Sequence, residues 1–304
     1  MLRTRQAAVW PALFVASFAV LSGRLPVAGL AAGRALAQSN ATTALKDALL
    51  FHAGFDNGTD ASFGRGDRRL YTAASFREQQ NATPGLNSPD AEITRGGGRF
   101  GSALKFTKQN MLAIFYNAEN NIAFSKSNWS GTVSFWLSVD MVADLPPRFC
   151  DPIQITDSSA SDGAVWVDFT NPNPRSFRLG VFGDQAVWNP ENVPLSQYPP
   201  AFNRRIVVVQ SPPFAGGKWT HIAITHDALG GGQGTAKLYL DGKLRGTTEK
   251  VAEPFTLDAS KTSIRLGVNY VGLFDELAIF NRALTDSEVR VLYELATGVS
   301  GLHS

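Results

Sequence analysis

Cysteine is the scarcest residue of this chain, because Cys150 is the only one among 304 residues. A single cysteine rules out an intrachain disulfide. The thiol could pair between two chains, but a buried and inert cysteine is the commoner case. A domain without disulfides must be stabilised by burial of its core, by a metal, or by both. The hydrophobic share of 44% is enough to build such a core.

Positive and negative side chains are nearly equal in number. The chain has 28 Lys and Arg residues against 26 Asp and Glu residues, which is a formal net charge of +2. Proteins that bind nucleic acids carry a basic stripe or face that contacts phosphates. The sequence shows no such stripe, so we expect no nucleic-acid partner.

The chain also lacks an apolar run long enough to cross a membrane. The run from Ala7 to Leu21 is shorter than the ~20 residues of a spanning helix. A basic start, MLRTRQ, precedes this run, and the small residues Ala35-Leu36-Ala37 follow it, which is typical of a secretory signal peptide. We therefore predict a signal peptide at residues 1–37 and a protein that is secreted or resides in the periplasm or cell envelope. A membrane anchor is the alternative, although nothing after the leader is apolar enough to span a membrane.

Long helical periods and repeats at solenoid or propeller spacing are absent as well. Short segments of β propensity instead alternate with Gly, Pro and Asn, which indicates a β-sandwich or barrel. Ala48 to Phe55 is predicted to be the first strand, and residues 56–90, rich in turn formers, a long surface loop. Further strands are predicted near 91–94, 102–107, 112–116, 132–139, 152–156, 164–169, 176–182 and 205–210.

The stretch from Trp219 to Tyr293 predicts a hairpin, a strand and a helix in that order. Two alternating segments flank Asp241-Gly242, a pair that suits the positive φ angles of a type I′ turn. The segment LFDELAIF at 273–280 then predicts a strand. A short amphipathic helix follows, and Thr285 with Glu288 three residues later has the spacing of a capping box.

Five segments carry a family resemblance through their order and spacing: Gly98–Leu104 (GRFGSAL), Thr132–Val139 (TVSFWLSV), Trp219–Ala223 (WTHIA), Leu238–Gly242 (LYLDG) and Phe274–Leu277 (FDEL). Together with Phe55-Asp56, they resemble the laminin-G-like, concanavalin A-like lectin domain. The resemblance implies an all-β fold, a two-sheet antiparallel jelly-roll sandwich with a short C-terminal helix. It covers residues 48–297, which leaves 38–47 as a linker and 298–304 as a tail.

The sequence contains no catalytic motif that we can identify. His221 and His226 are five residues apart, so on one strand they point to opposite faces and cannot chelate one metal together. No Gly-x-Ser-x-Gly elbow occurs. The Glu-x-Asp-x-x-Glu pattern of related jelly-roll glucanases is also missing. We therefore expect that the chain is not an enzyme, with a glycoside hydrolase or a polysaccharide lyase as the alternative.

A structural Ca²⁺ is implied by the resemblance, because similar jelly rolls often hold one where the first and last strands meet. Ca²⁺ takes six to eight oxygen ligands, which suits loops rich in Asp, Asn and Gly. Asp56 and Asp275 lie at those two ends and are the predicted side-chain ligands. In the alternative interpretation, Asp56 caps a turn and Asp275 is solvated.

A segment of about 20 residues, from Gly183 to Asn203, is the predicted binding loop. Loops of this length are often functional, and sugars stack on aromatic rings edged by polar groups. The alternative is that the aromatic rings pack beneath their own loop. The predicted ligand-binding residues are Trp188, Tyr198, Phe202, Trp166, Asp184, Asn189 and Arg204.

These observations together favour an exported, non-catalytic module that recognises a carbohydrate or a cell-surface glycan. An envelope structural or protein-interaction domain is the second hypothesis. A polysaccharide-active enzyme is the third.

Overall fold

A computed structural model describes residues 27–171 and 173–303 of the chain. The chain divides into two compact units, Met1–Ala37 and Gln38–Ser304. Most of the predicted signal peptide, residues 1–26, lies outside the described residues. Helix α1 (Val27–Ala48) includes the predicted linker 38–47, in which Leu45 is fully buried. No helix in the described ranges is long and apolar enough to cross a membrane.

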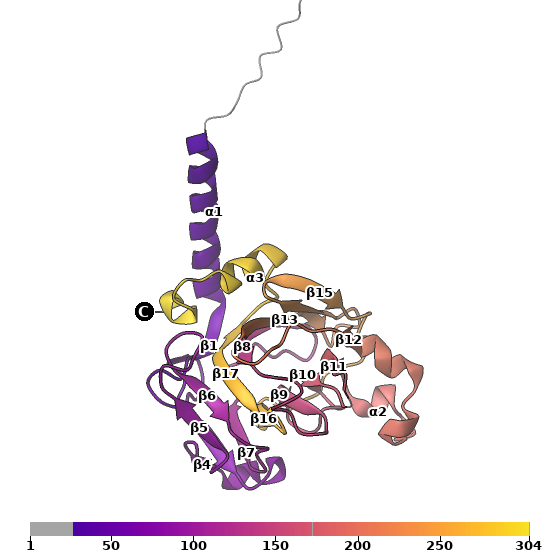
Figure 1. Ribbon diagram of the computed structural model, residues 1–304. Helices are drawn as coiled ribbons and strands as arrows, with labels where there is room; N and C mark the ends of the chain where they lie inside the picture. Colours follow the sequence, from indigo (N-terminus) through magenta and orange to yellow (C-terminus); the bar gives the residue numbers. More distant parts are fainter. Residues whose placement is uncertain (1–26, 172, 304) are drawn as a thin grey trace, which may run out of the picture. The chain divides into compact units, whose positions relative to one another are not determined.

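The unit Gln38–Ser304 is built from two antiparallel sheets that face each other across a hydrophobic core (Figure 1). The nine-stranded sheet contains β1 (Leu49–Ala53), β2 (Phe63–Gly64), β5 (Ala91–Thr94), β6 (Ala103–Phe106), β8 (Trp129–Ser138), β13 (Trp219–Leu229), β14 (Thr235–Leu240), β15 (Lys243–Thr247) and β17 (Gly272–Phe280). The eight-stranded sheet contains β3 (Leu70–Ala73), β4 (Thr83–Pro84), β7 (Ala113–Asn117), β9 (Cys150–Thr156), β10 (Ala164–Phe169), β11 (Phe177–Phe182), β12 (Ile206–Val209) and β16 (Ser263–Val268). The predicted all-β, two-sheet sandwich is therefore confirmed.

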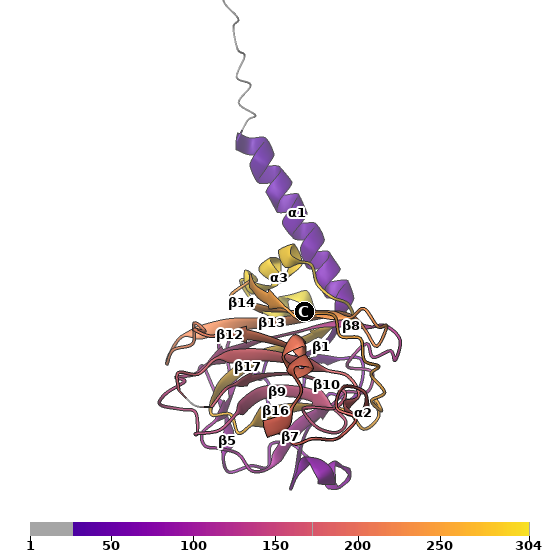
Figure 2. The same ribbon diagram turned by 90° about the vertical axis from the view of Figure 1, so that its right-hand side faces the viewer.

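Strand order separates sequence neighbours in both sheets. The nine-stranded sheet runs β15-β14-β13-β8-β17-β1-β2, with β5 and β6 attached through β17. The eight-stranded sheet runs β12-β11-β10-β9-β16-β7-β3-β4. Figure 2 shows β9, β10 and β16 as one layer and β13 and β14 as another. Strand β16 therefore lies between β7 and β9, although more than 100 residues separate it from either strand in the sequence.

Side chains alternate between the two faces of each strand, and the residues on the inner faces form the core. In β10, Val165, Val167 and Phe169 belong to the hydrophobic cluster between the sheets, whereas Trp166 and Asp168 do not. The outer face of the nine-stranded sheet is covered by α3 (Asp286–Tyr293), whose buried Val289 and Leu292 join a second hydrophobic cluster (Figure 1).

The sequence-predicted turn and cap are confirmed. Asp241 and Gly242 have φ angles of 51° and 70°, as a type I′ turn requires. Thr285 and Glu288 form the complete capping box. Cys150 is fully buried, and that burial raises the pKa of its thiol to about 11, so the thiol is inert at neutral pH.

Several features differ from the prediction, among them strand β16, which is not one of the predicted strands, and the linker 38–47, which lies within α1. The segment 56–90 is not one loop, because it contains β2, β3, β4 and the 3₁₀ helix η1 (Phe76–Asn81). Strand β3 is only four residues long, and its pairing with β7 is a tertiary contact that local sequence does not display. The predicted tail contains η4 (Val299–Leu302), and His303 Nε2 lies 2.8 Å from His52 Nδ1 on β1.

Candidate functional site

The outer face of the eight-stranded sheet carries a row of residues from six adjacent strands. Residues paired directly across antiparallel strands project from the same face. The strand registers place these residues in one line across β3, β7, β16, β9, β10 and β11: Tyr71, Phe115, Arg265, Gln154, Trp166 and Gly180. Their sequence neighbours Val165, Ile264 and Leu266 belong to the core. The row therefore faces away from the core.

Two buried carboxyl groups lie on the same face. Asp168 accepts two hydrogen bonds from Arg178, at 2.8 Å from Nε and 2.5 Å from Nη2. Gln154 Nε2 donates to Asp151 Oδ2 at 2.5 Å. Burial, reinforced by the Asp168 charge, raises the pKa of Asp151 to about 8. At neutral pH Asp151 therefore holds a proton. Burial also raises the pKa of Asp168, and its hydrogen bonds with Arg178 oppose that rise.

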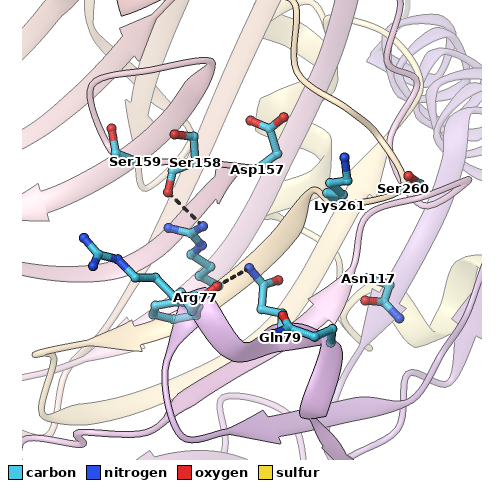
Figure 3. A pocket seen from close by; sticks show the side chains of 11 residues that line it. Arg77, Gln79, Asn117, Asp157, Ser158, Ser159, Ser260 and Lys261 are labelled. Atoms are coloured by element: carbon cyan, nitrogen blue, oxygen red, sulfur yellow. Dashed lines mark hydrogen bonds between the residues drawn. The ribbon is translucent and has the colours of Figure 1, made fainter.

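A pocket of about 740 Å³ opens beside this row. Arg77 and Gln79 of η1 line one side, and Ser158 and Ser159 of the turn after β9 line the opposite side (Figure 3). The remaining lining residues are Phe76, Gln80, Asn117, Asp157, Ser260, Lys261 and Arg265. Guanidinium, amide and hydroxyl groups therefore converge on one concave site, an arrangement that can hydrogen-bond a polar ligand from several directions.

Arg265 joins the row to the pocket. Its side chain is only 4% exposed, and its guanidinium carbon lies 4.5 Å from the centre of the Phe76 ring. Nε donates to Ser263 Oγ and Nη2 to the Ser158 carbonyl, both at 3.1 Å. Burial lowers the pKa of Arg265 to about 10, so the side chain remains charged at neutral pH. These contacts hold a cation rigidly at the base of the pocket.

The predicted binding loop does not present Trp188 to solvent, and Trp166, which lies on β10, is buried as well. Trp166 and Trp188 are each 5% exposed and pack with Phe182 in a separate hydrophobic cluster, which we call the loop cluster. Their indole N–H groups donate to the carbonyls of Ala160 and Ser161, at 2.7 and 3.0 Å. The loop lies over β10 and β11, and a Cβ on Gly180 would come within 2.1 Å of the Trp166 ring. The absence of a side chain at Gly180 therefore makes room for this packing, and neither indole offers a free ring face for a sugar.

The other predicted loop residues also make contacts within the protein. Tyr198 and Phe202 pack on the loop cluster, with their ring centroids 4.9 Å apart. Asp184 Oδ1 accepts from the Thr256 amide at 2.8 Å, and the Asn189 side chain both donates to and accepts from Val193 at 3.1 Å. Exposed Arg204 pairs with Glu249 at 3.5 Å. None of the seven predicted residues lines the pocket beside Arg265.

The predicted metal ligands, Asp56 and Asp275, accept hydrogen bonds from the backbone of the turn at 99–102. Asp275 Oδ2 accepts the backbone N–H groups of Arg99 and Phe100 at 2.7 and 3.1 Å, and Asp56 Oδ1 accepts that of Ser102 at 2.7 Å. Burial raises the pKa of Asp275 to about 8. Ca²⁺ takes six to eight oxygen ligands, and the contacts that these two carboxylates make to the turn are with backbone N–H donors. Within 27–171 and 173–303, no three His, Cys, Asp or Glu side chains form a metal-binding group. Calcium binding stays a prediction.

Comparison with known proteins identifies the family. The model of the concanavalin A-like lectin/glucanases superfamily matches residues 116–290. The chain belongs to this superfamily. The match includes β16 and the turn 157–159 of the pocket, whereas η1 lies before its start. No curated protein sequence matches the chain.

Solved structures share the fold at low sequence identity. Domain 4 of AbnA, an extracellular GH43 arabinanase from Geobacillus stearothermophilus solved with arabinotriose, is 20% identical, with 80% of this chain and 97% of that chain covered and a TM-score of 0.50. The botulinum neurotoxin serotype D ligand-binding domain, solved with N-acetylneuraminic acid, is 14% identical over 84% of this chain and 52% of that one, with a TM-score of 0.54. A botulinum neurotoxin DC binding domain in complex with rat synaptotagmin II is 15% identical over 82% and 52%, with a TM-score of 0.53. The chain thus spans about half the length of these toxin chains.

Sequence reasoning missed the pocket residues, although one signal was available. In β16, Ile264 and Leu266 alternate with Ser263 and Arg265, a period of two that predicts a strand with one polar face. That Arg265 lies beside Gln154 depends on strand order, which no local pattern reveals.

Proposed function

We propose that this protein is a carbohydrate-binding module whose binding site is the pocket between η1 and the turn after β9. The observation that carries the proposal is the pocket itself, because its amides, serines and guanidiniums are the groups that hydrogen-bond sugar hydroxyls. Structures of the same fold in complex with arabinotriose and N-acetylneuraminic acid support the assignment. The proposed site therefore lies beside the outer face of the eight-stranded sheet, and not in the Gly183–Asn203 loop that the sequence indicated.

A glycan array with matched variants tests this location. Asn117→Ala removes an amide that lines the pocket, whereas Asn192→Ala removes an exposed amide in the Gly183–Asn203 loop. We expect wild type and Asn192→Ala to bind the same glycans and Asn117→Ala to lose about tenfold in affinity, the value of one or two hydrogen bonds. The opposite ranking would return the site to the loop. Absence of glycan binding by wild type would leave the envelope-interaction hypothesis ahead, for which the synaptotagmin complex offers a precedent of the same fold.

A polysaccharide hydrolase is the second candidate. Its support is the pair of buried carboxyl groups on the same sheet face, in which the pKa of Asp151 is raised to about 8 and Asp168 is paired with Arg178, since hydrolases use one protonated and one ionised carboxyl group. Incubation with polysaccharides and measurement of reducing ends tests it, with Asp151→Asn as the inactive variant. No release of reducing ends by wild type would reject this candidate.

We also propose that the protein is exported. The support is the predicted leader, and the compact unit Gln38–Ser304 begins at the residue after the predicted cleavage position. Fractionation of cells that express the full chain, with N-terminal sequencing, should find a product that starts at Gln38. A product that retains residues 1–37 would support the anchor alternative.

A further inference from the structure

The charges around the pocket do not balance. Arg77, Lys261 and Arg265 contribute three cations, against one lining carboxylate, that of Asp157. Lys261 is neutralised by Asp258 at 3.0 Å, just outside the lining. No carboxylate in the described ranges forms an ion pair with Arg77 or Arg265, although Asp157 lies close enough to interact electrostatically with Arg265. Two guanidinium groups are therefore left to face the pocket without a paired anion.

Arg265 is the more informative of the two, because it is buried. A guanidinium has five N–H donors, and the contacts of Arg265 to protein acceptors in the described residues involve Nε and Nη2 only. Burial of a charge without a paired counter-ion costs free energy, which the Phe76 ring and two hydrogen bonds offset only in part. Because Arg265 also lines the pocket, an anion of the ligand can supply the missing counter-ion.

Arg77 contributes a second, exposed cation to the pocket lining. It is carried by η1, and Figure 3 shows its side chain on the side of the pocket that faces Ser158 and Ser159. Guanidinium groups bind carboxylate and sulfate through paired N–H···O bonds. The neutral groups of Gln79 and Asn117 remain for hydroxyls. One end of the site thus suits an anion, and the rest suits a polyol.

We propose that the pocket binds an acidic saccharide, whose carboxylate or sulfate group is held by Arg265 and Arg77. This inference rests on the proposed carbohydrate-binding function and adds the class of sugar. A volume of about 740 Å³ also suits a ligand larger than a free anion, since small-molecule sites range over roughly 300–1,000 Å³.

Titration calorimetry with matched sugars tests the inference on the full chain. The probes are oligogalacturonide and its fully methyl-esterified neutral form, then a sulfated galactan oligosaccharide and its desulfated form. We expect the acidic member of at least one pair to bind about tenfold or more tightly than its neutral match, as a charge-assisted contact provides. The pair that shows this preference identifies the anion as carboxylate or sulfate. Equal affinity within both pairs would overturn the inference but preserve the proposed function, whereas failure of the glycan array would overturn both.

Variants separate a specific contact from general attraction. Arg77→Gln removes the exposed cation, and Arg95→Gln removes an equal charge from an exposed position outside the pocket. We expect Arg77→Gln to lose about tenfold in affinity for the acidic probe and nothing for its neutral match, and Arg95→Gln to lose less than twofold. Equal losses in the two variants would overturn the inference, because they would reflect net charge alone. Arg77 is exposed, so its replacement does not threaten folding as replacement of Arg265 does.

Discussion

Trp188 is either a binding platform or a core residue, and the substitution Trp188→Ala tells the two roles apart. Loss of a binding platform lowers glycan affinity, whereas loss of a core residue lowers stability. In the structure its indole is 5% exposed, with Phe182 and Tyr198 ring centroids at 5.5 and 5.0 Å. A ring of this size buries about 200 Å², which at ~25 cal/mol per Å² gives an upper value of ~5 kcal/mol. The bond from Nε1 to the Ser161 carbonyl adds about 1 kcal/mol.

We therefore expect Trp188→Ala to lower the free energy of unfolding by about 3–5 kcal/mol, the range measured for buried tryptophans. Urea-induced unfolding followed by circular dichroism measures it. Val187→Ala is the matched control, because Val187 is adjacent on helix α2 (Gln185–Trp188) and 54% exposed, and we expect a change within about 0.5 kcal/mol. Under conditions in which Trp188→Ala is folded, its glycan affinity should equal that of wild type.

A loss of less than about 1 kcal/mol in Trp188→Ala, with glycan binding abolished, would refute this reasoning. Trp188 would then be exposed in the ligand-free protein for much of the time. The loop predicted from the sequence would again be the binding site.

Three further measurements follow from the structure. Burial lowers the pKa of His226 to about 4, against about 6.5 in the unfolded chain, so protonation favours the unfolded state and the contribution of neutral His226 to stability is lost as pH falls from about 6.5 towards 4. Between pH 7 and pH 5, the free energy of unfolding of wild type should therefore fall by about 2 kcal/mol more than that of His226→Gln. An equal fall in the two proteins would contradict this. Thr285→Ala should cost about 1 kcal/mol in urea unfolding and Thr285→Ser much less, whereas equal losses would show that the cap hydroxyl is not responsible. The calcium prediction requires EDTA to lower the melting temperature, and an unchanged midpoint would leave Asp56 and Asp275 with only their backbone contacts.

Most of the fold was predictable because the strands of a sandwich alternate between a buried and an outer face. The pattern located β10 at Ala164–Phe169 with its core residues Val165 and Val167. It failed at Leu70–Ala73, where four residues are too few to show a period and the partner strand β7 supplies the hydrogen bonds. A strand as short as β3 owes its structure to pairing with β7 and β4 on either side.

The site was less predictable than the fold. Aromatic residues in a long loop drew attention to Trp188 and Tyr198, yet the outer face of β10 and β11 is itself apolar at Trp166 and Phe182, and the loop packs on that part. The alternation of Ser263 and Arg265 with two apolar residues predicts a strand with a polar face, but it does not mark a site. The proposed role of Arg265 depends on Gln154, Phe76 and Ser158, which other strands and turns bring beside it.

The sequence by itself determined the two-sheet sandwich, the Asp241-Gly242 turn and the capped helix at Thr285, because each depends on residues that are close in the chain. The tertiary structure alone decided which sheet face carries the pocket and which aromatic rings are buried. Strand order is the physical reason, since β16 lies between β7 and β9 and so brings a buried cation to the wall that η1 forms more than 180 residues earlier in the chain.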